Sequence, residues 1–220
     1  MAKSRDKTDT EALKKRNDEL AHELATLRRK LASEEKELVQ VLITLDEKAQ
    51  DVLRPHRDFD LTLSAALSQA FSAAKNVLRA AIPYITPGGY PDFSSLIGLA
   101  LDSPARIDLL FRYPEGDSSV ELMERLVRLY AEELGAGKVR LRYLGAPGRS
   151  GLHAKVVICD DTFAIVSSAN WTGYSLSSNA EAGIGTHSKR AINMLSAWFD
   201  FTYANALSWE TVKESLTDNE

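Results

Sequence analysis

Two short apolar runs, separated by a pair of aspartates, constrain the fold of this chain more than any other feature. Residues 154–159 and 162–166 are rich in β-branched side chains, and Asp160 and Asp161 between them are typical of a turn. The sequence therefore predicts a buried β-hairpin. His153 and Lys155 lie two positions apart at its start, and residues at that spacing in a strand point to the same face.

The polar residues around this hairpin are suited to phosphate chemistry. Lys155 would offer a compact positive charge to a phosphate oxygen, and His153 can attack phosphorus or pass a proton near neutral pH. Ser168 and Asn170 follow the second run and can donate from a hydroxyl and an amide to the same phosphate. Glu181 is expected to orient the histidine and stabilise its charged form.

The order and spacing of these residues resemble the HKD motif of the phospholipase D superfamily. That motif reads His-x-Lys, four residues, Asp, six residues, then Gly-Ser-x-Asn. The matching residues are His153, Lys155, Asp160, Ser168 and Asn170. Ser167 stands where the family usually has glycine, which exchanges one small residue for another. The wording around Asn170 and Glu181 is similar to the bacterial, single-motif nuclease branch, in which a glutamate partners the histidine.

The resemblance implies an active site built from two motifs that face each other. A second His-x-Lys occurs at His187 and Lys189, but Met194 stands where the aspartate should be, and we interpret this stretch as a helix start. A chain with one motif then implies a homodimer with a two-fold axis through one shared site.

The implied mechanism starts with attack of His153 on phosphorus, while His153 of the second subunit protonates the leaving oxygen. Lys155 and Asn170 of both subunits would hold the nonbridging oxygens, with Ser168 assisting. Asp160 is expected to organise the hairpin or a neighbouring lysine rather than transfer protons. The resemblance implies neither a metal nor another cofactor.

The composition indicates which cellular compartment and which kinds of binding partner to expect. The net charge of −4 does not indicate a chain that binds polyanions over its whole surface. Cys159 is expected to be a small buried hydrophobe, and a single cysteine fits a reducing, cytoplasmic setting. The sequence predicts no signal peptide and no membrane span, because no apolar run approaches about 20 residues.

Residues 1–52 contain a heptad pattern that predicts an N-terminal coiled-coil helix. The positions assigned to the seam are Leu13, Asn17, Leu20, Leu24, Leu27, Leu31, the charged Glu34, Leu38, Val41 and Leu45. The alternative is a long amphipathic helix that folds back on the core of its own chain. Residues 53–59 are interpreted as a linker, in which Pro55 stops the helix.

Residues 60–206 alternate between strand-like and helix-like segments, which predicts the α/β class, a phospholipase D-like sandwich with a central mixed β-sheet flanked by helices. Residues 207–220 are interpreted as a C-terminal tail. Residues 77–85 are expected to form a strand, and residues 81–88 also resemble the first strand of phospholipase D domains.

Substrate identity is less constrained than reaction type. Lys138, Arg140 and Arg142 alternate with apolar residues, so they are expected to share one strand face, and Arg149 follows in the next loop. This basic row predicts contacts with nucleic-acid phosphates, or else a charged edge strand that discourages aggregation. We therefore expect a nuclease that cleaves DNA or RNA. The resemblance to the bacterial branch of the family implies a role in defence against foreign DNA. Two alternatives are a phospholipid or other phosphodiester hydrolase, and a non-catalytic tethering or nucleic-acid-binding protein.

Overall fold

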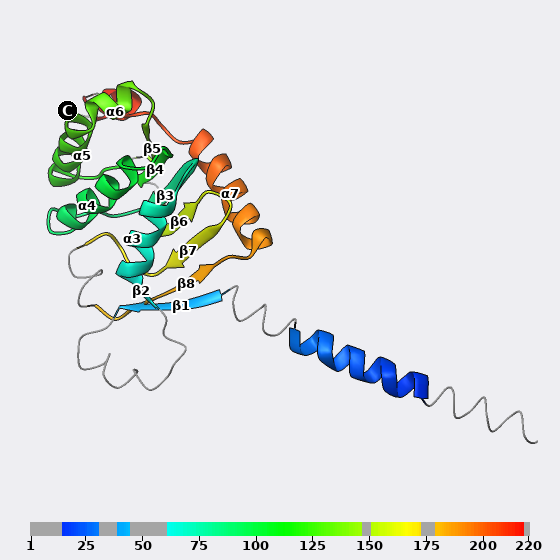
Figure 1. The fold of residues 1–220 in the computed structure, drawn as a ribbon. Helices are drawn as coiled ribbons and strands as arrows, with labels where there is room; N and C mark the ends of the chain where they lie inside the picture. Colours follow the sequence, from blue (N-terminus) through cyan, green and yellow to red (C-terminus); the bar gives the residue numbers. More distant parts are fainter. Residues whose placement is uncertain (1–14, 31–38, 45–60, 147–150, 173–178, 218–220) are drawn as a thin grey trace, which may run out of the picture. The chain divides into compact units, whose positions relative to one another are not determined.

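The computed structural model describes residues 15–30, 39–44, 61–146, 151–172 and 179–217. The chain divides into two units, Met1–Leu38 and Val39–Glu220. In the first unit, residues 15–30 form a helix. In the second unit, strands and helices alternate along most of the chain (Figure 1).

The second unit is built on one mixed β-sheet. Its eight described strands follow the order β2-β1-β8-β7-β6-β3-β4-β5. The strands are β1 (Val39–Thr44), β2 (Leu61–Thr62), β3 (Val77–Ile82), β4 (Arg106–Arg112), β5 (Val139–Leu144), β6 (Val156–Cys159), β7 (Phe163–Ser167) and β8 (Glu181–Thr186). β3, β4 and β5 are parallel, because helices connect them in sequence. β6, β7, β8 and β1 pair antiparallel with one another in the order β6-β7-β8-β1, and β2 pairs parallel with β1. β6 joins the two halves of the sheet through its antiparallel pairing with β3.

Helices cover both faces of the sheet, so the α/β class and the flanked mixed sheet are confirmed (Figure 1). The helices are α3 (Leu63–Ala73), α4 (Tyr90–Leu101), α5 (Asp117–Leu129), α6 (Ala131–Gly135), α7 (Lys189–Ala204) and α8 (Trp209–Thr217). Residues of α3, α4, α5 and α8 pack into the larger apolar core on one face. On the other face, Ile192 and Phe199 of α7 pack into a smaller core with Val156, Ile158 and Ala164.

The direction of the strands brings several chain segments to one edge of the sheet. β3, β4, β5 and β7 end at this edge, whereas β6 and β8 begin there, because β6 runs antiparallel to β3 and β7. We call it the motif edge. His153 and Lys155 precede β6, and Glu181 is the first residue of β8, so all three belong to it.

The prediction of one continuous helix over residues 1–52 is wrong for residues 39–44. These form β1, which pairs with β8 from Val39↔Thr186 to Thr44↔Glu181. Leu42 is fully buried, while Val41 on the other face of the strand is 49% exposed. Val41 fits a heptad as well as it fits a strand, and the long-range pairing with β8 decides between the two. Leu31, Glu34, Leu38, Leu45 and the linker of residues 53–59 lie outside the described residues.

The helix of residues 15–30 keeps part of the predicted heptad seam. Leu20, Leu24 and Leu27 lie along it and are 46%, 51% and 64% exposed. Their spacing is that of a coiled-coil stripe. Pairing of this helix with a second copy therefore stays a prediction.

Residues 207–220 are not simply a tail, because α8 forms within them. Trp209 and Val212 are buried, and the ring centroid of Trp209 lies 5.4 Å from that of Tyr143 on β5. The packed domain therefore starts before residue 60 and continues past residue 206. Two apolar side chains spaced three apart were the available signal for this helix.

Asp160 anchors the end of the sheet opposite the motif edge. Its carboxylate accepts hydrogen bonds from the backbone N–H groups of Lys75, Asn76 and Val77 at 2.9, 2.8 and 2.8 Å. Its φ of 51° is in the left-handed region, which aspartate tolerates in tight turns. The interpretation that Asp160 organises the hairpin is supported, and its contacts are with backbone groups at the start of β3.

We predict that Asp160→Ala lowers the free energy of unfolding by about 2–4 kcal/mol, because three backbone donors lose their charged acceptor. Chemical denaturation followed by circular dichroism measures this change. Asp161→Ala is the matched control, since Asp161 is exposed and pairs only with exposed Lys189, and it should change stability by less than about 1 kcal/mol. Equal effects of the two substitutions would contradict the anchoring role.

Candidate active site

The histidine and the lysine of the motif meet as the sequence predicts, although the strand begins only at Val156. Nζ of Lys155 lies 3.3 Å from Nδ1 and 3.4 Å from Nε2 of His153, and it donates a hydrogen bond to the His153 carbonyl oxygen at 3.0 Å. The backbone carbonyl of Lys155 in turn accepts from the N–H of Ser167 on β7. The pair is therefore held by the sheet itself.

The two side chains differ in their access to water. Lys155 is only 8% exposed, whereas His153 is exposed at the motif edge. Burial lowers the pKa of the Lys155 ammonium below its usual value, and the Glu181 carboxylate opposes this fall. A charged group that has lost hydration gains most from an anionic partner, so this lysine is suited to hold a phosphate oxygen.

Ser168 and Glu181 contact each other across the gap between β7 and β8. The Ser168 hydroxyl donates to Oε2 of Glu181 and accepts from the N–H of Ala182 at 3.1 Å. The expected direct contact between Glu181 and His153 does not form, because the carboxylate is engaged by Ser168. Glu181 acts on the basic pair through its charge, by raising the pKa of Lys155. Ser168 positions this carboxylate rather than pointing a free donor at the site.

Asn170 lies on the loop that follows β7, and its neighbour Trp171 secures that loop. Trp171 is 3% exposed, and its ring packs against Phe71 and Phe93. Its backbone N–H donates to the backbone carbonyl of Tyr84 at 3.0 Å. The Asn170 Oδ1 atom is buried and has no hydrogen-bond partner among the described residues. The amide therefore keeps unused hydrogen-bonding capacity on a fixed loop.

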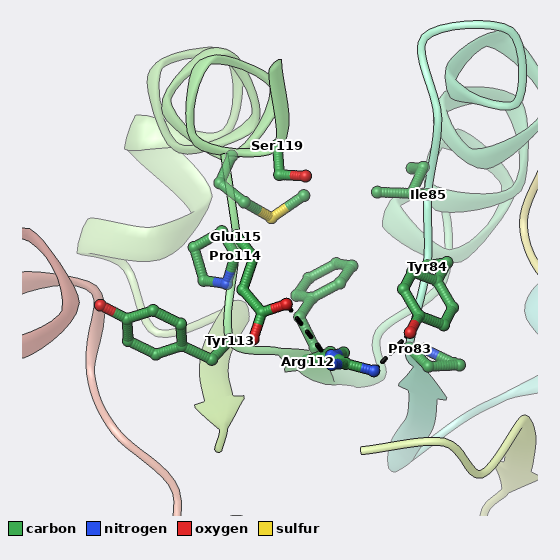
Figure 2. A pocket seen from close by; sticks show the side chains of 10 residues that line it. Pro83, Tyr84, Ile85, Arg112, Tyr113, Pro114, Glu115 and Ser119 are labelled. Carbon is green, nitrogen blue, oxygen red and sulfur yellow. Dashed lines mark hydrogen bonds and ion pairs between the residues drawn. The ribbon is translucent and has the colours of Figure 1, made fainter. Parts of the chain in front are cut away.

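Two residues that the sequence analysis did not select also belong to this edge. The ring of Tyr84 meets the imidazole of His153 edge to face, with 6.3 Å between centroids. The guanidinium of Arg112 lies 5.3 Å from the centre of the Tyr84 ring and donates to its hydroxyl (Figure 2). Both residues come at or just after the ends of parallel strands, where ligand sites gather in α/β sheets. That position was the signal that would have found them.

Arg112 also borders the start of the motif. A Cβ atom at Gly151 would lie 3.2 Å from Cγ of Arg112 and 2.8 Å from the carbonyl oxygen of Leu144. Glycine is therefore required at position 151 for the chain to approach β4 and β5 so closely. This approach brings the arginine and the motif to the same edge.

The basic row is only partly available to a ligand. Arg140 makes two hydrogen bonds of 2.6 Å to the buried carboxylate of Asp108, and these raise the pKa of the guanidinium. Lys138 precedes β5 at the end opposite the motif edge, and its ammonium donates to the carbonyl of Ser103. Contact of these two residues with nucleic-acid phosphates therefore stays a prediction, while each already has a partner within the protein.

The remaining residues of the row are Arg142 and Arg149. Arg142 lies in a separate hollow beside Tyr203 and Glu210, and Arg149 lies outside the described residues. β5 ends the sheet on that side, in the order of the described strands. The alternative interpretation, a charged edge strand, fits this position better.

The second His-x-Lys is a helix start, as the sequence predicts. The Ser188 side chain caps α7 by accepting from the N–H of Ala191. Nδ1 of His187 lies 2.8 Å from the carbonyl oxygen of Thr162, and Lys189 pairs with Asp161. These contacts are at the end of β6 and β7 opposite His153. β6 is four residues long, which separates the two ends by roughly 13 Å.

Cys159 is buried, as the sequence predicts, and burial raises the pKa of its thiol to about 11. The thiol therefore stays protonated at neutral pH. Within the described ranges, no group of three or more histidine, cysteine, aspartate or glutamate side chains gathers as a metal site. None of the described helices is both long enough and apolar enough to cross a membrane.

A comparison with protein families matches residues 67–202 to the family described as "Cardiolipin synthase, PLD-like domain". The chain belongs to the phospholipase D superfamily. The match includes the whole of the motif from His153 to Glu181.

Individual relatives agree on the fold. Cardiolipin synthase 1 of Bacillus cereus is 25% identical over 158 residues, which cover 70% of this chain and 29% of that protein. The chain therefore spans less than a third of that relative. The phospholipase D family member Nuc of Salmonella typhimurium superposes with a TM-score of 0.57 and 14% identity, covering 78% of this chain and 98% of Nuc. Phosphatidylserine synthase of Haemophilus influenzae superposes with a TM-score of 0.61 and 14% identity, covering 80% of this chain and 41% of the synthase.

We predict that binding of inorganic phosphate weakens as the pH rises through the lowered pKa of Lys155, below the usual lysine range, because the ammonium loses its proton. Calorimetric titration at several pH values above 7 measures this loss. Glu181→Gln keeps an acceptor for Ser168 but removes the charge that raises the pKa of Lys155, so the loss should begin at lower pH.

Glu124→Gln is the control for this titration, since Glu124 lies on α5 and its ion pair is with Arg128. It should leave the pH dependence unchanged. A profile that is identical in the wild type and in Glu181→Gln would contradict the electrostatic link between Glu181 and Lys155.

Proposed function

We propose that this protein is a nuclease that hydrolyses phosphodiester bonds of DNA or RNA through a phosphohistidine at His153. The observation that carries the proposal is the contact between an exposed imidazole and a buried ammonium at the motif edge. The ammonium can hold a nonbridging phosphate oxygen within reach of the ring that attacks phosphorus.

The reaction takes place in two steps. A ring nitrogen of His153 attacks phosphorus, a nitrogen–phosphorus bond forms, and the bond from phosphorus to the leaving oxygen breaks. The leaving oxygen takes a proton from a second imidazole. That second imidazole then removes a proton from water, the resulting hydroxide attacks phosphorus, and His153 is released.

The second imidazole must come from outside this site, because one ring cannot attack phosphorus and protonate the opposite oxygen at once. His187 is held at the other end of the hairpin by Thr162. We therefore propose that a second copy of the chain contributes its own His153 across a two-fold axis. Lys155 and Asn170 of both copies would then surround the phosphate.

An exposed apolar row on the sheet supports this pairing. Val41, Ile184 and Val166 are aligned across β1, β8 and β7, and they are 49%, 50% and 42% exposed. We call these three residues the apolar row. β8 begins at Glu181 and β7 is followed by Ser168, so Ile184 and Val166 lie within three residues of the motif edge. Burial of the row against its own copy would join two sites by their edges.

A nucleic acid is favoured over a lipid by the groups beside His153. Tyr84 is 40% exposed, and Arg112 lies against its ring. Exposed aromatic rings with arginine are typical of sites that bind single-stranded nucleic acid, because every base offers a flat face for stacking. A lipid substrate would favour an amphipathic or apolar surface at the mouth of the site.

A phospholipid substrate is the second candidate. The matched family is described as cardiolipin synthase, and a cardiolipin synthase of Bacillus cereus is among the relatives. The same His153 and Lys155 chemistry applies to a phosphodiester of glycerol. Cleavage of phosphatidylglycerol vesicles, rather than of nucleic acid, would favour this candidate.

We predict that the wild type cleaves labelled single- or double-stranded DNA or RNA in excess EDTA, and that His153→Ala abolishes cleavage while keeping the melting temperature. EDTA resistance is expected because lysine holds the phosphate charge. His187→Ala is the matched control, since it removes a histidine from the His-x-Lys that caps α7, and it should retain activity. Activity in His153→Ala would refute the nucleophile.

The shared site makes a separate prediction for mixed dimers. When wild-type and His153→Ala chains are co-expressed or co-refolded in varying ratio, activity should fall as the square of the wild-type fraction, because each site needs two intact histidines. A linear fall would mean that each chain works alone.

The apolar row gives a third test of the dimer. Ile184→Asp places a charge in the middle of the row and should yield a monomer by light scattering, with loss of the cleavage activity. Leu129→Asp is the control, because Leu129 is similarly exposed at 55% but lies on α5, away from the row. Monomeric wild-type protein at micromolar concentration would contradict the model.

A further inference from the structure

A small hollow lies between the loops that follow β3 and β4 and the start of α5 (Figure 2). Its volume is about 130 Å³. Its lining includes Tyr84, Phe111, Arg112, Glu115, Ser119 and Met123. A cavity of roughly this size holds a single six-membered ring.

The hollow has an apolar interior and a polar rim. Phe111 and Met123 are 2% and 5% exposed and form part of its buried wall. At the rim, the Arg112 guanidinium spans from the Tyr84 hydroxyl to Oε2 of Glu115, 3.5 Å away (Figure 2). A ligand would therefore meet a flat, apolar surface and a donor beside an acceptor.

The position of the hollow ties it to the reacting phosphate. The Tyr84 ring forms one of its walls and also meets the His153 imidazole, at 6.3 Å between ring centroids. A group bound there would share the Tyr84 ring with the His153 imidazole. The hollow is thus placed to hold part of the substrate next to the bond that breaks.

The chemistry of the rim decides which part of a substrate fits. A second phosphate would be repelled by the Glu115 carboxylate, and an acyl chain would find a hollow too short and a rim too polar. A nucleobase has a flat face for Tyr84 and Arg112, an acceptor edge for the guanidinium, and N–H groups for the carboxylate. The size favours a single-ring base, and cytosine offers its amino group to a carboxylate.

We propose that this hollow is a nucleobase subsite, in which Tyr84 and Arg112 hold the base of the nucleotide next to the scissile phosphate and Glu115 accepts its N–H groups. The inference rests on the proposed nuclease function and deepens it. The subsite gives the enzyme a preference for strands that carry bases over an equally charged backbone without them.

The experiment compares two labelled substrates of equal length and charge, oligo-deoxycytidylate and an oligomer of abasic tetrahydrofuran phosphates. The ratio of their kcat/KM values reports the subsite, whereas cleavage of the abasic strand reports the phosphodiesterase itself. In the wild type, the base-bearing strand should be favoured by about tenfold, the usual scale of one base–aromatic stack.

Two substitutions act on the subsite by different routes. Tyr84→Leu removes the stacking ring, and Ser119→Phe fills the hollow from its half-buried rim, so each should bring the ratio close to one. Tyr84→Phe keeps the ring and should keep most of the preference. Melting temperatures establish that each variant is folded, and the ratio is read only within one variant.

The outcomes separate the subsite from the chemistry. A ratio of one in the wild type, or a ratio unchanged in both Tyr84→Leu and Ser119→Phe, overturns the subsite while His153-dependent cleavage stands. If the wild type cuts neither oligomer but cuts phosphatidylglycerol vesicles, the nuclease function fails and the subsite fails with it.

Discussion

The antiparallel pairing of β6 with β3 is the constraint on which the rest of the structure depends. It runs from Leu78↔Cys159 to Ala81↔Val156 and joins a parallel half of the sheet to an antiparallel half. Because β6 runs against β3, its beginning lies where β3 and β4 end. His153, Tyr84 and Arg112 therefore meet, although they are far apart in the sequence. Asp160 secures the other end of this pairing through three backbone N–H groups.

The free-energy cost of burying a charge at this site falls mainly on one residue. Lys155 is buried beside an imidazole, and burial lowers the pKa of its ammonium. Glu181 partly offsets this cost from the neighbouring strand, while Ser168 keeps the carboxylate in place. A phosphate would complete this set of charges. This is an arrangement of charge that only the complete sheet can produce.

The distribution of other charged residues follows from strand direction. Lys138 and Lys189 lie at the edge opposite the motif, where each has a partner within the protein, and Arg140 is bound to Asp108 within the sheet. Three positive charges on one strand face looked like a phosphate track in the sequence. Burial of Asp108 between neighbouring strands makes Arg140 a structural partner instead. Charge alternation in a strand predicts which side chains share a face, but it does not predict what lies opposite them.

The sequence by itself determined the family of the chain and the strands that carry its motif. The spacing from His153 to Asn170 is local, and so are the two apolar runs of the hairpin, which form the buried strands β6 and β7 as predicted. Local pattern is enough here because strand and helix periods depend only on neighbouring residues. The position of Cys159 in the buried hairpin follows from the same pattern.

Only the tertiary structure decided the partners that come from distant segments. The sequence of β1 fits a heptad pattern, but these residues form a strand that pairs with β8. α8 packs against the sheet through the contact between Trp209 and Tyr143. The Glu181 carboxylate accepts a hydrogen bond from Ser168 rather than from His153. Tyr84 and Arg112 belong to the site although no sequence motif indicates them. In each case the deciding energy comes from contacts between residues far apart in the chain, and the order of the strands determines which of those contacts can form.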